Sequence, residues 1–229
     1  MGQATLPGSP DIPITLRRSG RARRMSLRVS RLDGRVTLSI PSWTSEREAL
    51  SFVREKEGWI RKALAETPGV VVPRIGGTVL FEGREVPVLE GAGRGARYAD
   101  GAFHLAPGAR VGPALAGALK VMARDRLAEA VSRHSAAIGR DAGSISLRDT
   151  RSRWGSCASS GNLMFSWRLV MAPPEVLDYV AAHEVAHLAE MNHSPAFWQQ
   201  VERLMPGYRP PRRWLRENGA LLHRYKFGD

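Results

Sequence analysis

The stretch His183-Glu184-Val185-Ala186-His187, followed by His193, decides the fold and the chemistry expected of this chain. On a helix, His183 and His187 lie one turn apart and face the same way, so both imidazoles can reach one metal ion. Glu184 stands beside the first of them, where it can take a proton from water at the open position of the metal without binding the metal itself. The spacing therefore predicts a zinc site with Glu184 as general base.

The residues before this motif predict that it lies on a buried helix. Pro173 and Pro174 mark the start of the helix, because proline is tolerated in a first turn, where its missing N–H is not needed. Apolar residues then follow at Val176, Leu177, Val180, Ala181 and Ala182. This pattern indicates a helix packed into a core rather than one on a solvated surface.

The segment after the motif breaks the helical pattern at Asn192, His193, Ser194 and Pro195. A turn here can return His193 to the same ion as a third nitrogen ligand and leave a fourth position for water. The same residues can also be interpreted as a cap, with Ser194 starting a new helix. We favour the ligand interpretation, because it completes the open three-ligand set that is typical of catalytic zinc.

Several motifs around the histidines resemble those of a known family, the YgjP-like metallopeptidases, which are relatives of the SprT-like and WLM metalloproteases. The resemblance covers residues 14–225 and is most specific from residue 145 onward. The matching runs are Thr150-Arg151-Ser152-Arg153-Trp154-Gly155-Ser156-Cys157, residues 162–173, Tyr179-Val180, the histidine motif, Asn192-His193-Ser194-Pro195, Phe197-Trp198, Met205-Pro206-Gly207-Tyr208, Trp214-Leu215 and Asn218-Gly219.

The resemblance implies a zinc-dependent hydrolase, taken to be a peptidase, with one zinc per chain. Its ligands would be His183, His187 and His193, and Glu184 would be the base. We accordingly expect an α+β fold in which an amino-terminal β-rich part precedes a zincin-like (SprT-like) helical metallopeptidase domain with a small sheet. The expected partner is a peptide or protein substrate, although hydrolysis of another amide would use the same residues.

Two other arrangements of the metal site stay open. The spacing from His187 to His193 equals that of the metzincins, but Glu190 replaces the glycine at which they turn. If Glu190 bound the metal instead of His193, the site would be gluzincin-like. A structural zinc would need a fourth protein ligand, for which Cys157, Glu190 and His223 are the candidates.

Substrate-binding residues are expected next to the metal helix. An exposed strand beside such a helix can hold an extended peptide by backbone pairing, and Trp154, Gly155 and Ser156 are our candidates for that strand, with Tyr179 nearby. Core packing by Trp154 and Cys157 with a turn at Gly155 is the equally weighted alternative. The residues chemically able to stabilise the oxyanion are Tyr179, Arg168, Tyr208 and His223.

Length and composition favour a cytoplasmic enzyme. The 229 residues can bury a substantial core without disulfides, and the single cysteine, Cys157, fits a reducing compartment. We interpret Cys157 as a buried strand residue rather than a nucleophile. No apolar stretch approaches the roughly 18 residues needed to span a bilayer, so we expect no membrane association.

The net charge of +12 suggests weak, sequence-independent nucleic-acid binding as an alternative role. In that case the zinc site would act on DNA-bound protein or be structural. Thirty of the 34 basic residues are arginine, a bias that genome composition could also produce, and a solvated strand face is the simpler interpretation. The densest runs are Arg17, Arg18, Arg21, Arg23 and Arg24, and Arg209, Arg212 and Arg213.

The remaining sequence predicts a scaffold in three segments. Residues 1–12 are expected to be a flexible amino terminus, residues 13–110 a β-rich part with one long helix, and residues 111–229 the metallopeptidase domain. Alternating residues on either side of Asp33-Gly34 predict a hairpin, and Ser45 with Glu48 predicts a capping box. Further strands are expected at 78–81, 85–89, 103–105, 144–147 and 163–167, and a long helix at 115–138.

Overall fold

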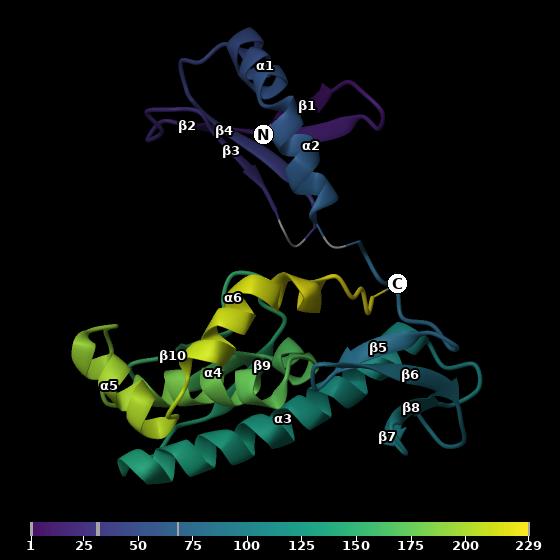
Figure 1. The fold of residues 1–229 in the computed structure, drawn as a ribbon, viewed down its shortest axis with the longest axis vertical. Coiled ribbons are helices and arrows are strands. Elements are labelled where there is room, and N and C mark those ends of the chain that lie inside the picture. Colours follow the sequence, from purple (N-terminus) through teal and green to yellow (C-terminus); the bar gives the residue numbers. More distant parts are fainter. Residues whose placement is uncertain (1, 31–32, 68, 229) are drawn as a thin grey trace. The chain divides into compact units, whose positions relative to one another are not determined.

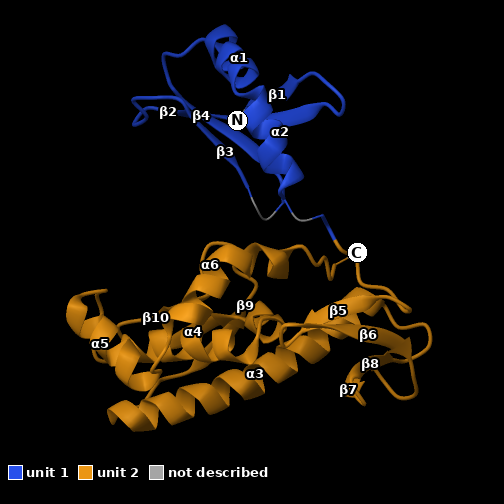
Figure 2. Cartoon of the chain, in the orientation of Figure 1, with its two compact units in different colours: residues 1–70 blue, residues 71–229 orange. Residues whose placement is uncertain are grey.

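A computed structural model describes residues 2–30, 33–67 and 69–228, and the chain forms two compact units, residues 1–70 and 71–229 (Figure 2). Strands open the first unit, and the second combines two further small sheets with most of the helices (Figure 1). The expected α+β fold, with amino-terminal strands followed by a helical part with a small sheet, is confirmed.

The first unit is a four-stranded sheet with two helices. Its elements are β1 (Gly2–Leu6), β2 (Ile12–Ser19), β3 (Ser26–Val29), β4 (Val36–Pro41), α1 (Glu46–Glu55) and α2 (Glu57–Ala65). The sheet order is β1-β2-β4-β3, and the central β2 and β4 run parallel. The expected hairpin is the β3–β4 pair, and the expected capping box is present at Ser45. One long helix was expected, but the chain breaks it at Lys56.

Residues 2–6, expected to be flexible, form strand β1, which pairs with β2. This pairing has a physical reason, because Leu6 is buried in the core of the first unit. That core is almost entirely aliphatic, with one face of the sheet packed against the two helices. Its buried members are Leu6, Ile12, Ile14, Leu16, Val36, Leu38, Ile40, Ala49, Val53 and Ile60.

The second unit begins with another four-stranded sheet. Its strands are β5 (Thr78–Phe81), β6 (Arg84–Glu90), β7 (Ala96–Ala99) and β8 (Ala102–Leu105). The order β5-β6-β8-β7, with an antiparallel, a parallel and an antiparallel pair, repeats the topology of the first sheet. The two sheets are therefore topologically equivalent, with β4 corresponding to β8.

Helices and a three-stranded sheet complete the second unit. They are α3 (Val111–Ile138), β9 (Ile145–Arg148), β10 (Gly155–Cys157), β11 (Leu163–Ser166), the 3-10 helix η1 (Trp167–Met171), α4 (Pro174–Ala186), α5 (Pro195–Leu204) and α6 (Arg209–His223). The small sheet has the order β10-β11-β9, so β10 is an edge strand. Helix α4 begins at the expected proline and is buried along most of its length.

The division at residue 70 differs from the boundary near residue 110 that we expected. Val79, Val88 and Phe103 of the second sheet share one core with Leu115 and Leu119 of α3, so the sheet belongs with the helices that follow it. The same core continues through β11 and η1 to α4 and α5. In the part of the chain that the structure describes, no helix is long and apolar enough to cross a bilayer.

Candidate metal centre

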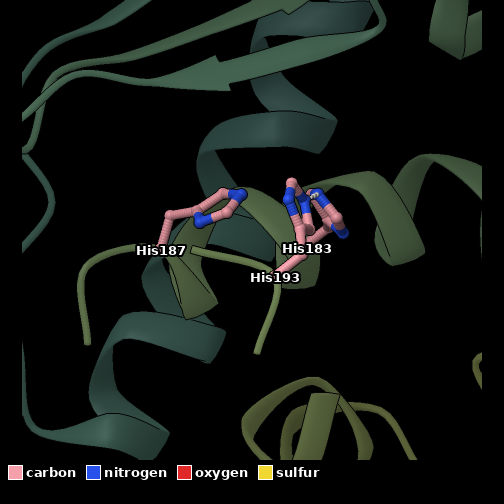
Figure 3. A group of neighbouring side chains, drawn as sticks. All are labelled: His183, His187 and His193. Atoms are coloured by element: carbon pink, nitrogen blue, oxygen red, sulfur yellow. Dashed lines mark hydrogen bonds between the residues drawn. The ribbon is translucent and has the colours of Figure 1, made fainter. Parts of the chain in front are cut away.

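Three histidines converge at the end of α4. His183 lies in its last turn, His187 caps it with helical backbone angles, and His193 returns from the loop that leads into α5. One ligand atom from each lies within 4.8 Å of the others (Figure 3). The structure thus brings together the three side chains that the sequence proposed as ligands.

The loop that returns His193 is fixed by hydrogen bonds on its carboxyl-terminal side. The Ser194 backbone N–H donates to Asn192 Oδ1 at 3.1 Å, and the Phe197 N–H donates to Ser194 Oγ at 3.3 Å, so Ser194 caps α5. The capping interpretation and the return of His193 are therefore compatible, because the cap fixes the backbone next to the histidine.

A backbone hydrogen bond orients the His187 imidazole, and the Nε2 atoms of the other two histidines approach each other. His187 Nδ1 lies 3.0 Å from the Glu190 carbonyl, which assigns the proton to Nδ1 and leaves the lone pair on Nε2. His183 Nε2 and His193 Nε2 lie 3.1 Å apart. His183 Nδ1 is buried without a partner among the described residues, so its tautomer is held less firmly than that of His187.

Aromatic rings enclose the histidines on the side of α5. The ring of Phe197, which is fully buried, lies 4.4–4.9 Å from all three imidazoles by ring centroids. Trp198 contacts His183 and His193 from the next position on α5. These rings give the site an apolar wall.

Burial keeps two of these imidazoles neutral. Burial, with the charges of neighbouring histidines and Arg212, lowers the pKa of His183 to about 3. Burial also lowers the pKa of His187, although its hydrogen bond to Glu190 acts in the opposite direction. The neutral imidazole is the form that binds a metal ion.

Glu184 is buried beside the histidines. The residue is 5 % exposed, and burial raises the pKa of its carboxyl to about 7. Gly155 of β10 passes so close that an added Cβ would lie 2.6 Å from Glu184 Cγ. Only glycine leaves room for the strand and the carboxylate together.

A cavity of about 510 Å³ opens onto these groups. Histidines, Glu184 and β10 share its wall, because β10 runs beside α4. Its lining residues are Ser152, Arg153, Gly155, Ser156, Cys157, His183, Glu184, His187, Met191 and His193. Cys157 lies in a strand as expected, but it is half-buried on the cavity wall rather than buried. Burial and the Glu184 charge raise the pKa of its thiol, which disfavours the nucleophilic thiolate.

The other expected residues take different places. Trp154 packs on His223, at 5.0 Å between ring centroids, and against Gly219 of α6. Tyr179 is buried, with its ring 5.9 Å from that of His183 and stacked on Tyr208. Neither Trp154 nor Tyr179 is among the residues that line the cavity.

Among the four oxyanion candidates, Arg168 has its donors committed elsewhere. Its guanidinium binds both oxygens of Asp149 and the carbonyls of Leu222 and Tyr225. His223 and Tyr208 pack against aromatic neighbours. Tyr179 is the candidate that lies directly beside a proposed ligand.

Phe197, Trp198 and Arg212 could be named from the sequence, but their place beside the histidines could not be predicted from it. Arg212 sits 4.2 Å above the Trp198 ring, and its charge acts on both His183 and Tyr179. The arginines at the start of α6 are recognisable in the sequence as a cluster of positive charge. Their spacing does not show that one of them lies near enough to act on a histidine.

The group of described metal donors that meets at this point consists of the three histidines alone. Glu190 contributes its backbone carbonyl to His187 rather than a carboxylate oxygen to the group, and neither Cys157 nor His223 belongs to it. The donor set accordingly favours an open metal site over a closed structural one.

A family model supports metallopeptidase chemistry for this chain. The family model "YgjP-like, metallopeptidase domain" matches residues 23–218. A solved structure, the metallopeptidase zymogen of Pyrococcus abyssi abylysin, is similar at 19% identity over 40% of this chain and 93% of that chain, with a TM-score of 0.36. No curated protein matches.

Proposed function

The chain belongs to the YgjP-like metallopeptidase family, and we propose that it is a zinc-dependent peptidase in which Glu184 is the general base. The observation that carries the proposal is the meeting of three imidazoles and one buried carboxylate on the wall of a single cavity. A metallopeptidase acts on peptides or proteins with the help of a metal. Beyond family membership, we propose which metal is bound, which residues bind it and which residue is the base.

The three histidines offer donors that suit zinc, and one pair of them has the spacing of zinc ligands. Nitrogen ligands 2.0–2.1 Å from a tetrahedral zinc ion stand roughly 3.3 Å apart. The 3.1 Å between His183 Nε2 and His193 Nε2 is close to that separation. Imidazole nitrogen is also a preferred ligand of zinc, and three protein ligands with one open position are typical of catalytic sites.

The proposed reaction uses one residue of this chain for proton transfer. Zinc at this site would lower the pKa of water toward about 7 and polarise the carbonyl of the substrate. Glu184 then accepts the proton of the attacking water and delivers it to the leaving amine. The close passage of Gly155 limits where the Glu184 carboxylate can lie on the side of β10.

The edge strand supports a peptide as substrate. Strand β10 pairs with β11 on one side, and its other side is unpaired among the described residues. Gly155, Ser156 and Cys157 line the cavity from this strand. An extended peptide can pair with such an edge through its main chain, which recognises backbone rather than a particular sequence.

Metal analysis together with two carboxamide variants tests the proposal. We expect about one zinc per chain in the parent, and His193→Ala should lower zinc content as clearly as His183→Ala. Glu184→Gln should keep its zinc and lose roughly 10²-fold to 10⁴-fold in rate on casein or a mixed peptide library. Glu190→Gln is the matched control and should change the rate little.

Two results would contradict these assignments. Full zinc retention in His193→Ala after dialysis, by elemental analysis, would remove His193 from the ligand set. If Glu184→Gln cleaved as fast as the parent, the proposed mechanism would be wrong even with the metal in place.

A further inference from the structure

The face of the amino-terminal sheet opposite α1 and α2 carries polar and positively charged side chains and no acidic ones. Alternate residues of β2 and β4, such as Leu16 and Leu38, are buried toward the helices. The intervening residues point the other way, because successive side chains of a strand alternate between faces. We call this second side the open face; it consists of Gln3, Thr5, Pro13, Thr15, Arg17, Ser26, Arg28, Thr37 and Ser39.

The strand register arranges the open face in rows across the sheet. One row runs Gln3, Thr15, Thr37 and Arg28, and the next runs Arg17, Ser39 and Ser26. Arginine, serine, threonine and glutamine are side chains that commonly donate hydrogen bonds to phosphate oxygens. The rows thus present hydrogen-bond donors between two positive charges, Arg17 on β2 and Arg28 on β3, which β4 separates.

The charge of the open face is of one sign. None of its residues is acidic, and Arg17 and Arg28 are exposed without a carboxylate partner among the described residues. The connection from β2 to β3 adds the exposed Arg21, Arg23 and Arg24 beyond the edge of the rows. A surface of this kind attracts a polyanion.

We propose that the open face binds the phosphate backbone of duplex nucleic acid without reading its sequence. Its strand positions carry no aromatic side chain, so it lacks the stacking platform that proteins use for single strands. They also carry no large apolar side chain that could insert into a membrane. Charge and hydroxyl donors without stacking or insertion groups match a regular, doubly stranded phosphate backbone.

The second sheet provides an internal contrast. Its outward positions include an acidic residue, an apolar residue, a histidine and an arginine: Glu85, Leu89, His104 and Arg97. The same topology therefore does not by itself produce an acid-free face. This property is particular to the amino-terminal sheet.

The test measures binding of a fluorescent duplex of roughly 20 base pairs to the full chain by anisotropy at several salt concentrations. Replacing Arg17 and Arg28 together by glutamine should reduce the salt slope by about 2 and weaken binding roughly 10-fold to 100-fold near 0.1 M salt. The matched control replaces Arg47 and Arg54 of α1, which are exposed on the helix that covers the other face.

The control, also made with glutamine, changes the net charge of the same unit by the same amount. It should leave most of the binding intact, because Arg47 and Arg54 lie on α1 and not on the open face. Arg17→Lys with Arg28→Lys should restore binding, and circular dichroism checks the folding of each variant. Equal losses in the two glutamine pairs would overturn the proposal in favour of a net-charge effect. Absence of binding at low salt would overturn it as well, as would equal or stronger binding to anionic vesicles with the same dependence on Arg17 and Arg28.

Discussion

The two four-stranded sheets share one order and one set of strand directions, yet they occupy different positions in the architecture. The first sheet packs on α1 and α2 and shares an aliphatic core with those helices alone. The second contributes Phe81 and Phe103 to a core that runs on through α3 to Val180 of α4 and Phe197 of α5. Two sheets of the same topology therefore differ in role: the first forms a separate core with its own helices, and the second is part of the core that supports the histidine site.

The largest effect that this comparison predicts is confined to the second unit. Gly155→Ala would drive a methyl group into the Glu184 carboxylate, 2.7 Å from its Cδ, and displace the proposed base. We expect peptide hydrolysis to fall by about 10²-fold or more, because small displacements of catalytic groups have effects of this size. Zinc content and affinity for duplex DNA should equal those of the parent, by elemental analysis and anisotropy.

Gly117→Ala in α3 is the matched control, since the added methyl meets nothing within 4 Å. It should keep full activity. Normal activity in Gly155→Ala would show that the close approach of β10 to Glu184 has no part in the reaction.

The equivalent positions Leu38 in β4 and Phe103 in β8 test whether the two cores are separate. Both side chains are fully buried, and replacement by alanine should cost about 2–5 kcal/mol for leucine and about 3–5 kcal/mol for phenylalanine. Leu38→Ala should raise amide hydrogen exchange in residues 2–67 and leave α4 protected. Phe103→Ala should raise exchange in α3 and α4 and lower zinc content.

Exchange measured by mass spectrometry locates each effect along the chain. Increased exchange of α4 in Leu38→Ala would contradict the separation of the two cores.

Acid should destabilise the second unit more than the first. Burial alone would raise the pKa of Asp149, but the hydrogen bonds and charge of Arg168 outweigh it and lower the pKa. The ionised pair therefore stabilises the fold above the ordinary aspartate pKa of about 4, and this contribution is lost as the pH falls through the lowered value. Asp178 beside His134 and Arg133 behaves in the same way.

Asp149→Asn measures this smallest effect. It leaves the buried Arg168 without its carboxylate and should cost about 1–3 kcal/mol at neutral pH, while flattening the loss of stability below pH 4 in urea unfolding. In the first unit, Glu48 has a lowered pKa because of its bonds to Ser45, but it lies on the surface. Glu48→Gln is therefore expected to change the acid response little, and a steeper change there would contradict the comparison.

Local features could be predicted from sequence wherever one periodicity dominated. Helix α4 begins at the expected Pro174, because proline and the apolar spacing act together. The β3–β4 hairpin, the capping box at Ser45 and the strands on either side of Gly83 also agree with their local signals. The meeting of the three histidines could be anticipated for the same reason, since two of them lie one helical turn apart.

Features that depend on distant parts of the chain could not be predicted. Alternating residues indicate a strand but not its partner. The strand order common to the two four-stranded sheets therefore could not be predicted, nor could the membership of β5–β8 in the second unit. The need for glycine at position 155 could not be predicted either, because it arises from contact with the Glu184 carboxylate, 29 positions later in the chain. Arg212 comes near enough for its charge to act on His183 because it packs on the Trp198 ring, which belongs to another helix.

The Phe197 ring has a consequence for the kinetics of metal exchange. It packs against all three imidazoles and does not line the cavity, which the histidines share with β10. Under the proposed function, an ion would enter and leave through the same opening as the substrate. A peptide held along β10 would then slow the removal of zinc by a chelator, so the working enzyme would be protected from demetallation by its own substrate.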